Sequence, residues 1–321
     1  MSRVAAVDLG TNSTRLLVAD VDDGRLSNIA RETRITHLGE GVDERRLLLP
    51  AATARVRNVL ADFRRTVESL GAQRTLAIAT SAVRDAENGE AFLGEIEWSY
   101  GFETRMLSGH DEALLMFRGV TSERALETGT VIVDIGGGST ELVAGGPEGV
   151  RWHDSLDIGS VRLTERFLNS DPPTPDELDD AAAAVRALLA ERVPDEIRSD
   201  ISFAIGVAGT ITSLGALALG LEEYDHDRVH GFELTAQALD EQLRRLASVP
   251  LEERRGMRPL DPDRAPVIVG GAVIAREVLA YFGLDKLEIS ERDILDGAAL
   301  AAAELPEEEE GAAPPGAYTC C

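Results

Sequence analysis

A short pattern occurs twice in this chain, and the repeat limits the folds that the chain can adopt. The segment VDLGTNSTRLLV begins at Val7, and the segment VDIGGGSTELVA begins at Val133. Asp8 and Asp134 take the same place in the two segments, and glycine, serine, threonine and leucine positions after them agree at the same offset (134 − 8 = 126). The repeat predicts two related halves, each with one copy.

Each copy has the composition of a strand, a tight turn and a second strand. An apolar run ends in aspartate, a glycine-rich turn follows, and Ser-Thr leads into another apolar run. Glycine lets backbone N–H groups approach a phosphate closely, and hydroxyl groups add donors. A single glycine-rich hairpin is more typical of an ordinary β-turn, so it is the repetition that favours a clamp on a phosphate chain. The predicted phosphate-binding residues of the turns are Gly10, Thr11, Asn12, Ser13, Gly136, Gly137, Gly138, Ser139 and Thr140.

The length and composition favour two domains with aliphatic cores. The 321 residues suffice for two ordinary domains, and aromatic residues make up only 4% of a chain that is 44% hydrophobic. No apolar run approaches the roughly 20 residues of a membrane span, and no secretory signal opens the sequence. We therefore expect a cytoplasmic protein without a membrane partner. The adjacent Cys320 and Cys321 are expected in a solvated tail.

The formal net charge of −25 argues against some partners. Such a field opposes nonspecific binding to nucleic acid and to anionic membranes, so neither is expected. The basic residues are almost all arginine, with Lys286 as the only lysine. A polyanionic substrate would bind this chain only where arginine side chains and a divalent cation reverse the sign of the charge locally.

Residue patterns along the chain predict alternating strands and helices. Three strands are expected in residues 3–32, and Pro50 begins a helix with one apolar face. The other elements expected in the first half are a strand at 75–79, a helix at 90–98, a strand at 103–107 and a helix after Ser108. Those expected in the second half are strands within 130–157, helices at 160–169 and 175–192, a strand at 201–207, and helices from 210 and at 235–247, 263–282 and 293–303. The acidic segment from Pro306 cannot bury a core. We expect domains at 1–127 and 128–304 and a disordered tail at 305–321.

Five motifs follow one another along the chain: DLGTNST in the first turn, TSAVRDA at 80–86, SGHDEA at 108–113, VDIGGGSTELV at 133–143 and GVAGT at 206–210. Together, and in this order, they resemble the motifs of the exopolyphosphatase and guanosine pentaphosphate phosphohydrolase (Ppx/GppA) family. The resemblance covers roughly residues 3–304. It implies an α/β fold of the actin-like ATPase superfamily, with two ribonuclease-H-like domains around a cleft, in agreement with the duplication.

The resemblance implies catalytic roles for two residues of the first half. Glu112, the second acid of HDEA, would act as the general base that activates water against a terminal phosphorus. Arg84, in a loop after the predicted strand at 75–79, would hold two phosphate oxygens through its planar guanidinium. Apart from the resemblance, Ser108 and the acids after it are equally typical of a helix N-terminus, and a loop arginine is usually a surface residue.

Three carboxylates are candidates for holding Mg²⁺ (or Mn²⁺). Asp134 and Glu141 would hold the ion through water, with Asp8 opposite, because hard carboxylate oxygens and retained waters suit Mg²⁺. Gly209 and Thr210 open a predicted helix after a buried strand, where backbone N–H groups favour an anion. The same segment is also compatible with an ordinary strand-to-helix turn.

The sequence departs from the family pattern at two places. Leu114 stands where many members have arginine two residues after the catalytic glutamate, which removes a cation near the site. The segment DILDG from Asp293 replaces GLREG, so that Asp296 either lies at the cleft edge or caps a helix. His226 and His230 in DHDRVH could suggest a metal site, but a polar loop is the better interpretation because no third ligand is evident.

The reaction implied is hydrolysis of the terminal phosphoanhydride of inorganic polyphosphate, with release of orthophosphate. Long family members carry additional C-terminal domains, so we expect a preference for short polyphosphate here. Removal of the terminal 5′ phosphate of guanosine pentaphosphate is the close alternative. An actin-like sugar or acetate kinase and a nucleotide- or polyphosphate-binding regulator without turnover are alternatives of other classes. The resemblance also implies a homodimer.

Overall fold

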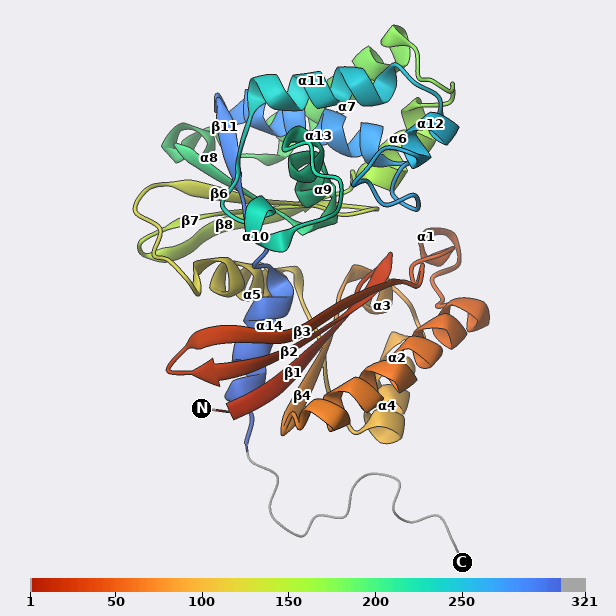
Figure 1. The fold of residues 1–321 in the computed structure, drawn as a ribbon, viewed down its shortest axis with the longest axis vertical. Coiled ribbons are helices and arrows are strands. Elements are labelled where there is room, and N and C mark those ends of the chain that lie inside the picture. The colour runs from red at the N-terminus through yellow and green to blue at the C-terminus, as the bar shows by residue number, and fades with distance from the viewer. Residues whose placement is uncertain (1, 307–321) are drawn as a thin grey trace, which may run out of the picture. The chain divides into compact units, whose positions relative to one another are not determined.

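The structure is a computed structural model that describes residues 2–306; Met1 and residues 307–321 lie outside the described part. The chain divides into two compact units (Figure 1). Of the described residues, unit 1 contains 2–124 and 293–306, and unit 2 contains Ala125–Arg292. Each unit has one mixed sheet with helices, which confirms the predicted α/β class. No helix within residues 2–306 is both long and apolar enough to cross a membrane.

Unit 1 contains a five-stranded sheet in the order β3-β2-β1-β4-β5. Its strands are β1 (Ser2–Leu9), β2 (Ser13–Asp22), β3 (Arg25–Ile35), β4 (Arg74–Ala79) and β5 (Glu103–Met106). The first three strands are antiparallel, whereas β1, β4 and β5 run parallel. The central strand β1 is almost continuously apolar because helices cover both faces of the sheet.

The helices of unit 1 pack on the sheet in two layers. They are α1 (Val42–Arg45), α2 (Pro50–Leu70), α3 (Ser81–Arg84), α4 (Gly89–Tyr100), α5 (Gly109–Thr121) and α14 (Ile294–Ala303). Helix α2 begins with proline, as predicted, and buries Val56, Leu60 and Phe63 on one stripe against the core. It ends at Gly71, whose left-handed backbone (φ 72°) suits glycine.

The last helix belongs to unit 1, which corrects the predicted domain boundaries. We placed residues 293–303 in a domain at 128–304, but α14 packs on α5 and on β1, β2 and β4. The reason is a close helix crossing, in which a Cβ on Gly297 would lie 1.9 Å from the Leu115 carbonyl oxygen. The predicted tail also begins too early. Leu305 is buried and its carbonyl accepts a hydrogen bond from Arg74 at 2.8 Å, while most of the predicted tail lies outside the described residues.

Unit 2 repeats the strand order of unit 1 with one strand added, β10-β11-β9-β6-β7-β8. Its strands are β6 (Thr130–Ile135), β7 (Thr140–Gly146), β8 (Gly149–Leu156), β9 (Phe203–Val207), β10 (Glu233–Thr235) and β11 (Lys286–Ile289). The shared order confirms two related domains of the ribonuclease-H-like class. The short β10 and β11 were not predicted, because three or four residues carry too little pattern.

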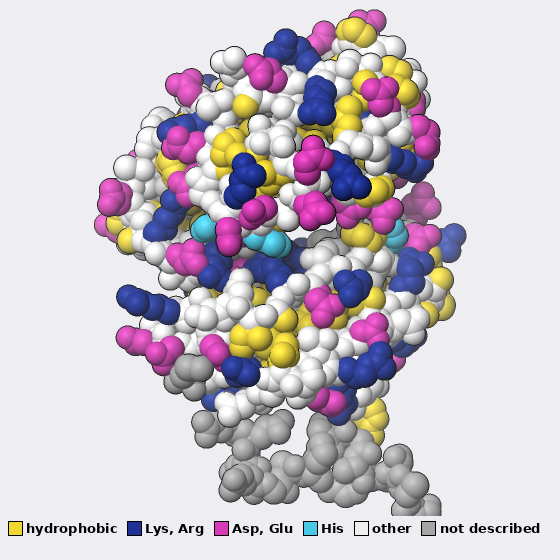
Figure 2. All heavy atoms as spheres, in the orientation of Figure 1, with side chains coloured by type: hydrophobic (Ala, Val, Ile, Leu, Met, Phe, Trp, Pro, Cys, Tyr) yellow, Lys and Arg dark blue, Asp and Glu magenta, His cyan; other side chains and the backbone are white. Residues whose placement is uncertain are grey.

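The helices of unit 2 enclose an aliphatic core, as the composition predicted. They are α6 (Ser160–Phe167), α7 (Pro175–Arg192), α8 (Asp195–Asp200), α9 (Ala208–Ala218), α10 (His226–Val229), α11 (Ala236–Ala247), α12 (Leu251–Arg255) and α13 (Ile268–Phe282). Helix α13 is central, since it packs against α6, α7, α9 and α11. On the face shown in Figure 2, acidic and basic side chains are interspersed.

Candidate active site

In unit 1, the predicted site residues follow three parallel strands at one sheet edge. The last residues of β1, β4 and β5 are in register, with Leu9 beside Ala79 and Ala79 beside Met106. The first turn follows β1, the segment with Arg84 follows β4, and the segment that leads to Glu112 follows β5. Carboxyl ends of parallel strands are the usual place for ligands in open α/β sheets. The topology therefore brings these residues to one edge.

The first glycine-rich turn is anchored from behind by the chain after β3. The Gly10 N–H donates to the Ser13 carbonyl at 3.0 Å, which closes the turn. The carbonyl of Asn12 accepts from residues 36 and 37, and that of Thr11 accepts from residue 39. The hydroxyls of Thr11 and Ser81 lie 3.1 Å apart, which ties the turn to the start of α3. The carbonyls of Thr11 and Asn12 are thus engaged by the chain after β3, which fixes the conformation of the turn.

The two predicted catalytic residues contact each other. The Arg84 guanidinium forms a hydrogen-bonded ion pair with the Glu112 carboxylate and donates to the Leu107 carbonyl at 2.7 Å. Glu112 is buried, whereas about a third of the Arg84 side chain (32%) is exposed. The arginine fixes the carboxylate at the sheet edge, and part of its own side chain stays exposed to solvent. Their catalytic roles remain predictions.

Glu112 is presented by the first turn of α5, which carries a complete capping box. The Ser108 hydroxyl accepts from the Asp111 N–H, and the Asp111 carboxylate accepts from the Ser108 N–H at 3.2 Å. The Ser108 hydroxyl also donates to Asp111 at 2.6 Å, and this side-chain bond lowers the pKa of Asp111. Asp111 therefore has a structural task in the helix start, next to Glu112.

We expect Asp111→Asn to destabilise the protein at neutral pH by about 0.3–1 kcal/mol, the usual value of an acidic charge in the first turn of a helix. Because the folded-state pKa of Asp111 is lowered, its charge stabilises the fold above the unfolded pKa of about 3.9 and stops doing so as pH falls through the folded value. Urea unfolding of both proteins at about pH 7 and about pH 3 checks this. An equal difference in the free energy of unfolding between the two proteins at both pH values would contradict this expectation.

Asp8 belongs to a buried ionic cluster that the sequence analysis missed. Arg15, opposite Asp8 in the hairpin register, donates two hydrogen bonds to Asp8 Oδ2 and one to Asp293. Arg31 pairs with Asp296, and its Nη1 lies 3.9 Å from Asp293 Oδ2. Burial raises the pKa of Asp8, although Arg15 opposes the rise, whereas the two arginines lower the pKa of Asp293 against the effect of burial. The one feature of the sequence that could have indicated this cluster is the pair of aspartates in DILDG.

In unit 2 the second turn has the same closure, and the following helix covers it. The Gly136 N–H donates to the Ser139 carbonyl at 3.0 Å. The carbonyls of Gly136 and Gly137 accept from the first N–H groups of α6, including that of Ser160 at 2.9 Å. Gly159 is required here, since a Cβ on it would lie 2.5 Å from Gly137 backbone atoms. The sequence analysis did not identify Gly159 and Ser160.

The hydroxyl groups of two predicted phosphate-binding residues already donate hydrogen bonds to backbone carbonyls. Thr140 is fully buried and donates to the Ile158 carbonyl at 2.5 Å, and Thr210 donates to the Ile135 carbonyl at 2.8 Å. A hydroxyl has one proton, so neither side chain is a phosphate donor in this arrangement. Both hydroxyls instead fix the segments around the turn.

Asp134 and Glu141 form the carboxylate pair that fits a divalent cation. They face each other across the β6–β7 hairpin, where directly opposite Cβ atoms lie about 4.5–5.5 Å apart. Glu141 Oε1 accepts from the hydroxyls of Ser139 at 2.6 Å and Ser155 at 2.9 Å, which orients its carboxylate. No group of three or more acidic, histidine or cysteine side chains suited to a metal occurs among residues 2–306. Two carboxylates with water as the remaining ligands match the habit of Mg²⁺.

An arginine missed by the sequence analysis lies at the start of α9. A Cβ on Gly209 would lie 2.1 Å from the Arg264 guanidinium, so glycine allows this side chain to lie against the backbone of the predicted phosphate-binding segment. Gly271 of α13 approaches Thr210 in the same way, because a Cβ there would lie 2.3 Å from Thr210 Cγ2. The start of α9 is thus in contact with α13 and with the Arg264 guanidinium. No local pattern identified Arg264.

Comparison with known proteins places these features in a family. A profile of the Ppx/GppA phosphatase family matches residues 17–303. This chain belongs to the Ppx/GppA phosphatase family. Its relatives include Exopolyphosphatase 2 of Mycobacterium tuberculosis, which is 41% identical over 94% of this chain and 99% of its own length. The crystal structure of the Aquifex aeolicus family member is 32% identical, with a TM-score of 0.83 over 94% of this chain and 98% of that chain.

Another solved structure shows that the fold is shared more widely. An exopolyphosphatase from Cytophaga hutchinsonii is 23% identical and has a TM-score of 0.84 over 96% of this chain and 100% of that chain. At this identity the likeness concerns the fold alone. The family resemblance proposed from the motifs is confirmed.

Both histidines of the DHDRVH segment contact Glu291 in this Ppx/GppA protein. His226 contacts Glu291 Oε2 at 3.0 Å through Nδ1, whereas Nδ1 of His230 accepts from the Glu291 N–H at 3.1 Å. Tyr224 donates to the same carboxylate, and burial together with that carboxylate raises the pKa of Tyr224. The segment was expected to be a polar loop, but residues His226–Val229 form the short helix α10, because Asp225 caps its first N–H groups.

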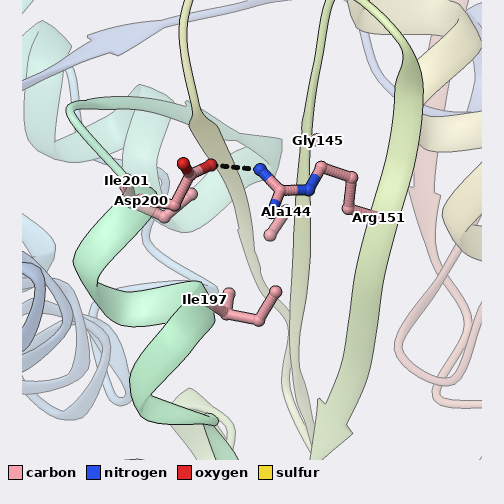
Figure 3. Close-up of a pocket in the computed structure, with 6 residues that line it drawn as sticks. All are labelled: Ala144, Gly145, Arg151, Ile197, Asp200 and Ile201. Carbon is pink, nitrogen blue, oxygen red and sulfur yellow. Dashed lines mark hydrogen bonds and ion pairs between the residues drawn. The ribbon is translucent and has the colours of Figure 1, made fainter.

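A hollow in unit 2 is unrelated to the predicted phosphate-binding turn. Figure 3 shows Arg151 and Asp200 as an ion pair across it, beside Ile197. The hollow has no room for a water molecule, and it adjoins Gly145, five residues along β7 from Thr140, or about 16 Å at the usual rise per residue. Its apolar lining and the ion pair that closes it do not suit a polyphosphate.

Proposed function

We propose that this protein is an exopolyphosphatase that hydrolyses the terminal phosphoanhydride of inorganic polyphosphate and releases orthophosphate. The observation that carries the proposal is the Glu112–Arg84 pair at the sheet edge beside the first glycine-rich turn. The name of the mycobacterial relative, 41% identical over nearly its whole length, supports the same substrate. The glycine-rich turn of each unit is proposed as a phosphate-binding segment.

The roles follow from the chemistry of the side chains. Phosphoryl transfer depends mainly on positioning and on neutralisation of charge, so no protein nucleophile is needed. Glu112 accepts a proton from the attacking water, and Arg84 orients the carboxylate and attracts the terminal phosphate. Backbone N–H groups of the two turns and of the start of α9 bind further phosphate oxygens.

A divalent cation, Mg²⁺ or Mn²⁺, would be held by Asp134 and Glu141. When bound, it would neutralise charge on the phosphate oxygens. Glu141 is oriented for this by two serine hydroxyls. Within a chain whose formal charge is −25, this cation and the arginines supply the local positive charge that a polyanion requires. We further propose that the protein is a cytoplasmic homodimer. Sedimentation of the purified protein tests the proposed dimer.

Orthophosphate release tests the proposed function. Short polyphosphate, long polyphosphate, guanosine pentaphosphate and ATP are compared with Mg²⁺, with Mn²⁺ and with a chelator. We expect cation-dependent release from polyphosphate above that from the nucleotides. Preferential release from guanosine pentaphosphate would move the assignment to the other activity in the family's name. Tight polyphosphate binding without release would indicate a regulator.

A further inference from the structure

The two repeated hairpins have one backbone geometry and differ in one charge. Each turn is closed by a glycine N–H that donates to a serine carbonyl at 3.0 Å. In each hairpin the aspartate one residue before the end of the first strand faces the residue seven positions later. This pair is Asp8 with Arg15 in unit 1 and Asp134 with Glu141 in unit 2. The second carboxylate of unit 2 is therefore replaced by a cation at the equivalent place in unit 1.

The Arg15 guanidinium is partly buried and lies between two carboxylates. Its Nε and Nη2 donate to Asp8 Oδ2 at 2.8 and 2.7 Å, and Nη1 donates to Asp293 Oδ2 at 2.5 Å. The exposed fractions of the three side chains are 16% for Arg15, 6% for Asp8 and 5% for Asp293. Arginine keeps its charge under all ordinary conditions, so this cation is permanent.

Helix α14 fixes the second carboxylate in place. Asp293 is the N-cap of α14, and its Oδ1 accepts from the Leu295 N–H at 2.9 Å, so that Oδ2 faces Arg15. Asp296 closes the capping box by accepting from the Asp293 N–H at 3.0 Å, and Arg31 pairs with Asp296. The DILDG segment thus holds Arg15 against Asp8 from the far end of the sequence.

We propose that Arg15 is a resident cation of the unit 1 hairpin and takes the place of a metal ion there, so that only the unit 2 hairpin binds a divalent cation. Asp8 is then a partner of Arg15 and not a metal ligand, contrary to the prediction from the sequence. The inference rests on the proposed metal-dependent function and assigns its cation to one hairpin. Arg15 acts through Asp8 as a positioning residue.

Replacement of Arg15 by glutamate gives unit 1 the carboxylate pair of unit 2. Asp8 Oδ1 is buried without a hydrogen-bond partner in the described part of the chain, and it would supply an oxygen to a cation after the exchange. We expect Arg15→Glu to bind one Mn²⁺ more per chain than the wild type and to gain a larger rise in Tm on addition of Mn²⁺. Electron paramagnetic resonance titration of free Mn²⁺ and thermal unfolding measure the two effects.

Two further variants keep the test decisive. Arg15→Gln removes the cation without adding an acid, and we expect this variant also to bind one additional Mn²⁺. It is the variant to use if the three adjoining carboxylates created by Arg15→Glu prevent folding. Arg34→Glu makes the same charge change at an exposed arginine on β3 and is expected to leave the number of bound ions unchanged. Wild-type binding of an ion in each hairpin, or no additional ion in a folded Arg15 variant, would overturn the proposal.

The proposed function fails in a different way from this inference. A wild-type protein that binds no Mn²⁺ would contradict the metal-dependent function. A gain of Mn²⁺ binding in the Arg15 variants would support the resident cation even then. Loss of wild-type Mn²⁺ binding in Glu141→Gln, with the additional ion retained in Glu141→Gln/Arg15→Glu, would support both assignments.

Discussion

Replacement of Glu112 by glutamine is expected to lower kcat for orthophosphate release by about 10²–10⁴-fold, the usual contribution of a positioned general base. The amide keeps the shape of the side chain but cannot accept the proton of the attacking water. The Arg84 ion pair would become a hydrogen bond from the charged guanidinium to a neutral amide oxygen. The KM for polyphosphate should change much less, because the turns and the cation carry most of the binding. Steady-state kinetics with short polyphosphate and saturating Mg²⁺ measure both parameters.

Asp111→Asn is the matched control for this prediction. It changes the adjacent acid in the same helical turn, and Asp111 serves the capping box instead of the chemistry. We expect it to lower the stability and to leave kcat within a few fold of the wild type. Equal losses of kcat in the two variants would show that the start of α5, and not the Glu112 carboxylate, is what the reaction requires.

Replacement of Gly297 by alanine is expected to destabilise unit 1 by about 1–3 kcal/mol, the usual cost of overpacking a close contact. The added Cβ would lie 1.9 Å from the Leu115 carbonyl oxygen, so α14 and α5 would have to separate. Gly119 makes the reciprocal contact, with a Cβ position 1.9 Å from the Asp293 carbonyl oxygen. Urea unfolding followed by circular dichroism measures the loss. Since α5 carries Glu112, kcat should fall as well.

Gly94→Ala is the control with the opposite expected sign. Gly94 lies inside α4, and the place of its Cβ is open space. Alanine there is expected to stabilise the protein by about 0.5–1 kcal/mol, because glycine is the poorer helix former. If Gly297→Ala were also stabilising, the close contact between α5 and α14 would not be a real constraint on the helix crossing.

Much of the architecture follows from local sequence patterns. The hairpins were predicted because apolar strands, a glycine-rich turn and the second strand are adjacent in the chain. Helix α2 was predicted because Pro50 and an apolar stripe mark its start and its buried face. The final helix was predicted as an element but assigned to the wrong unit. Its packing depends on Gly297 meeting α5, and a helical pattern does not say which surface a helix will cover.

The candidate site was predicted less completely than the fold. The Ser108 cap and the acids after it indicated the start of α5, and the family resemblance assigned Glu112 and Arg84; the structure adds that these two side chains are paired. The hydroxyl of Thr140 was expected to face a phosphate, yet it donates to the backbone. Arg264 was missed because its proximity to Gly209 arises only when α13 and α9 pack.

The sequence by itself determined the two glycine-rich turns, because a hairpin closes through residues that are neighbours in the chain. Only the tertiary structure decided that the carboxylates beside those turns have different environments. Asp8 meets Arg15 across one hairpin, but the Arg15–Asp293 contact joins residues 278 positions apart. Such a contact forms when α14 returns to the sheet of unit 1. Burial of apolar surface drives that return, and the hydrophobic effect has no direction that a local pattern could encode.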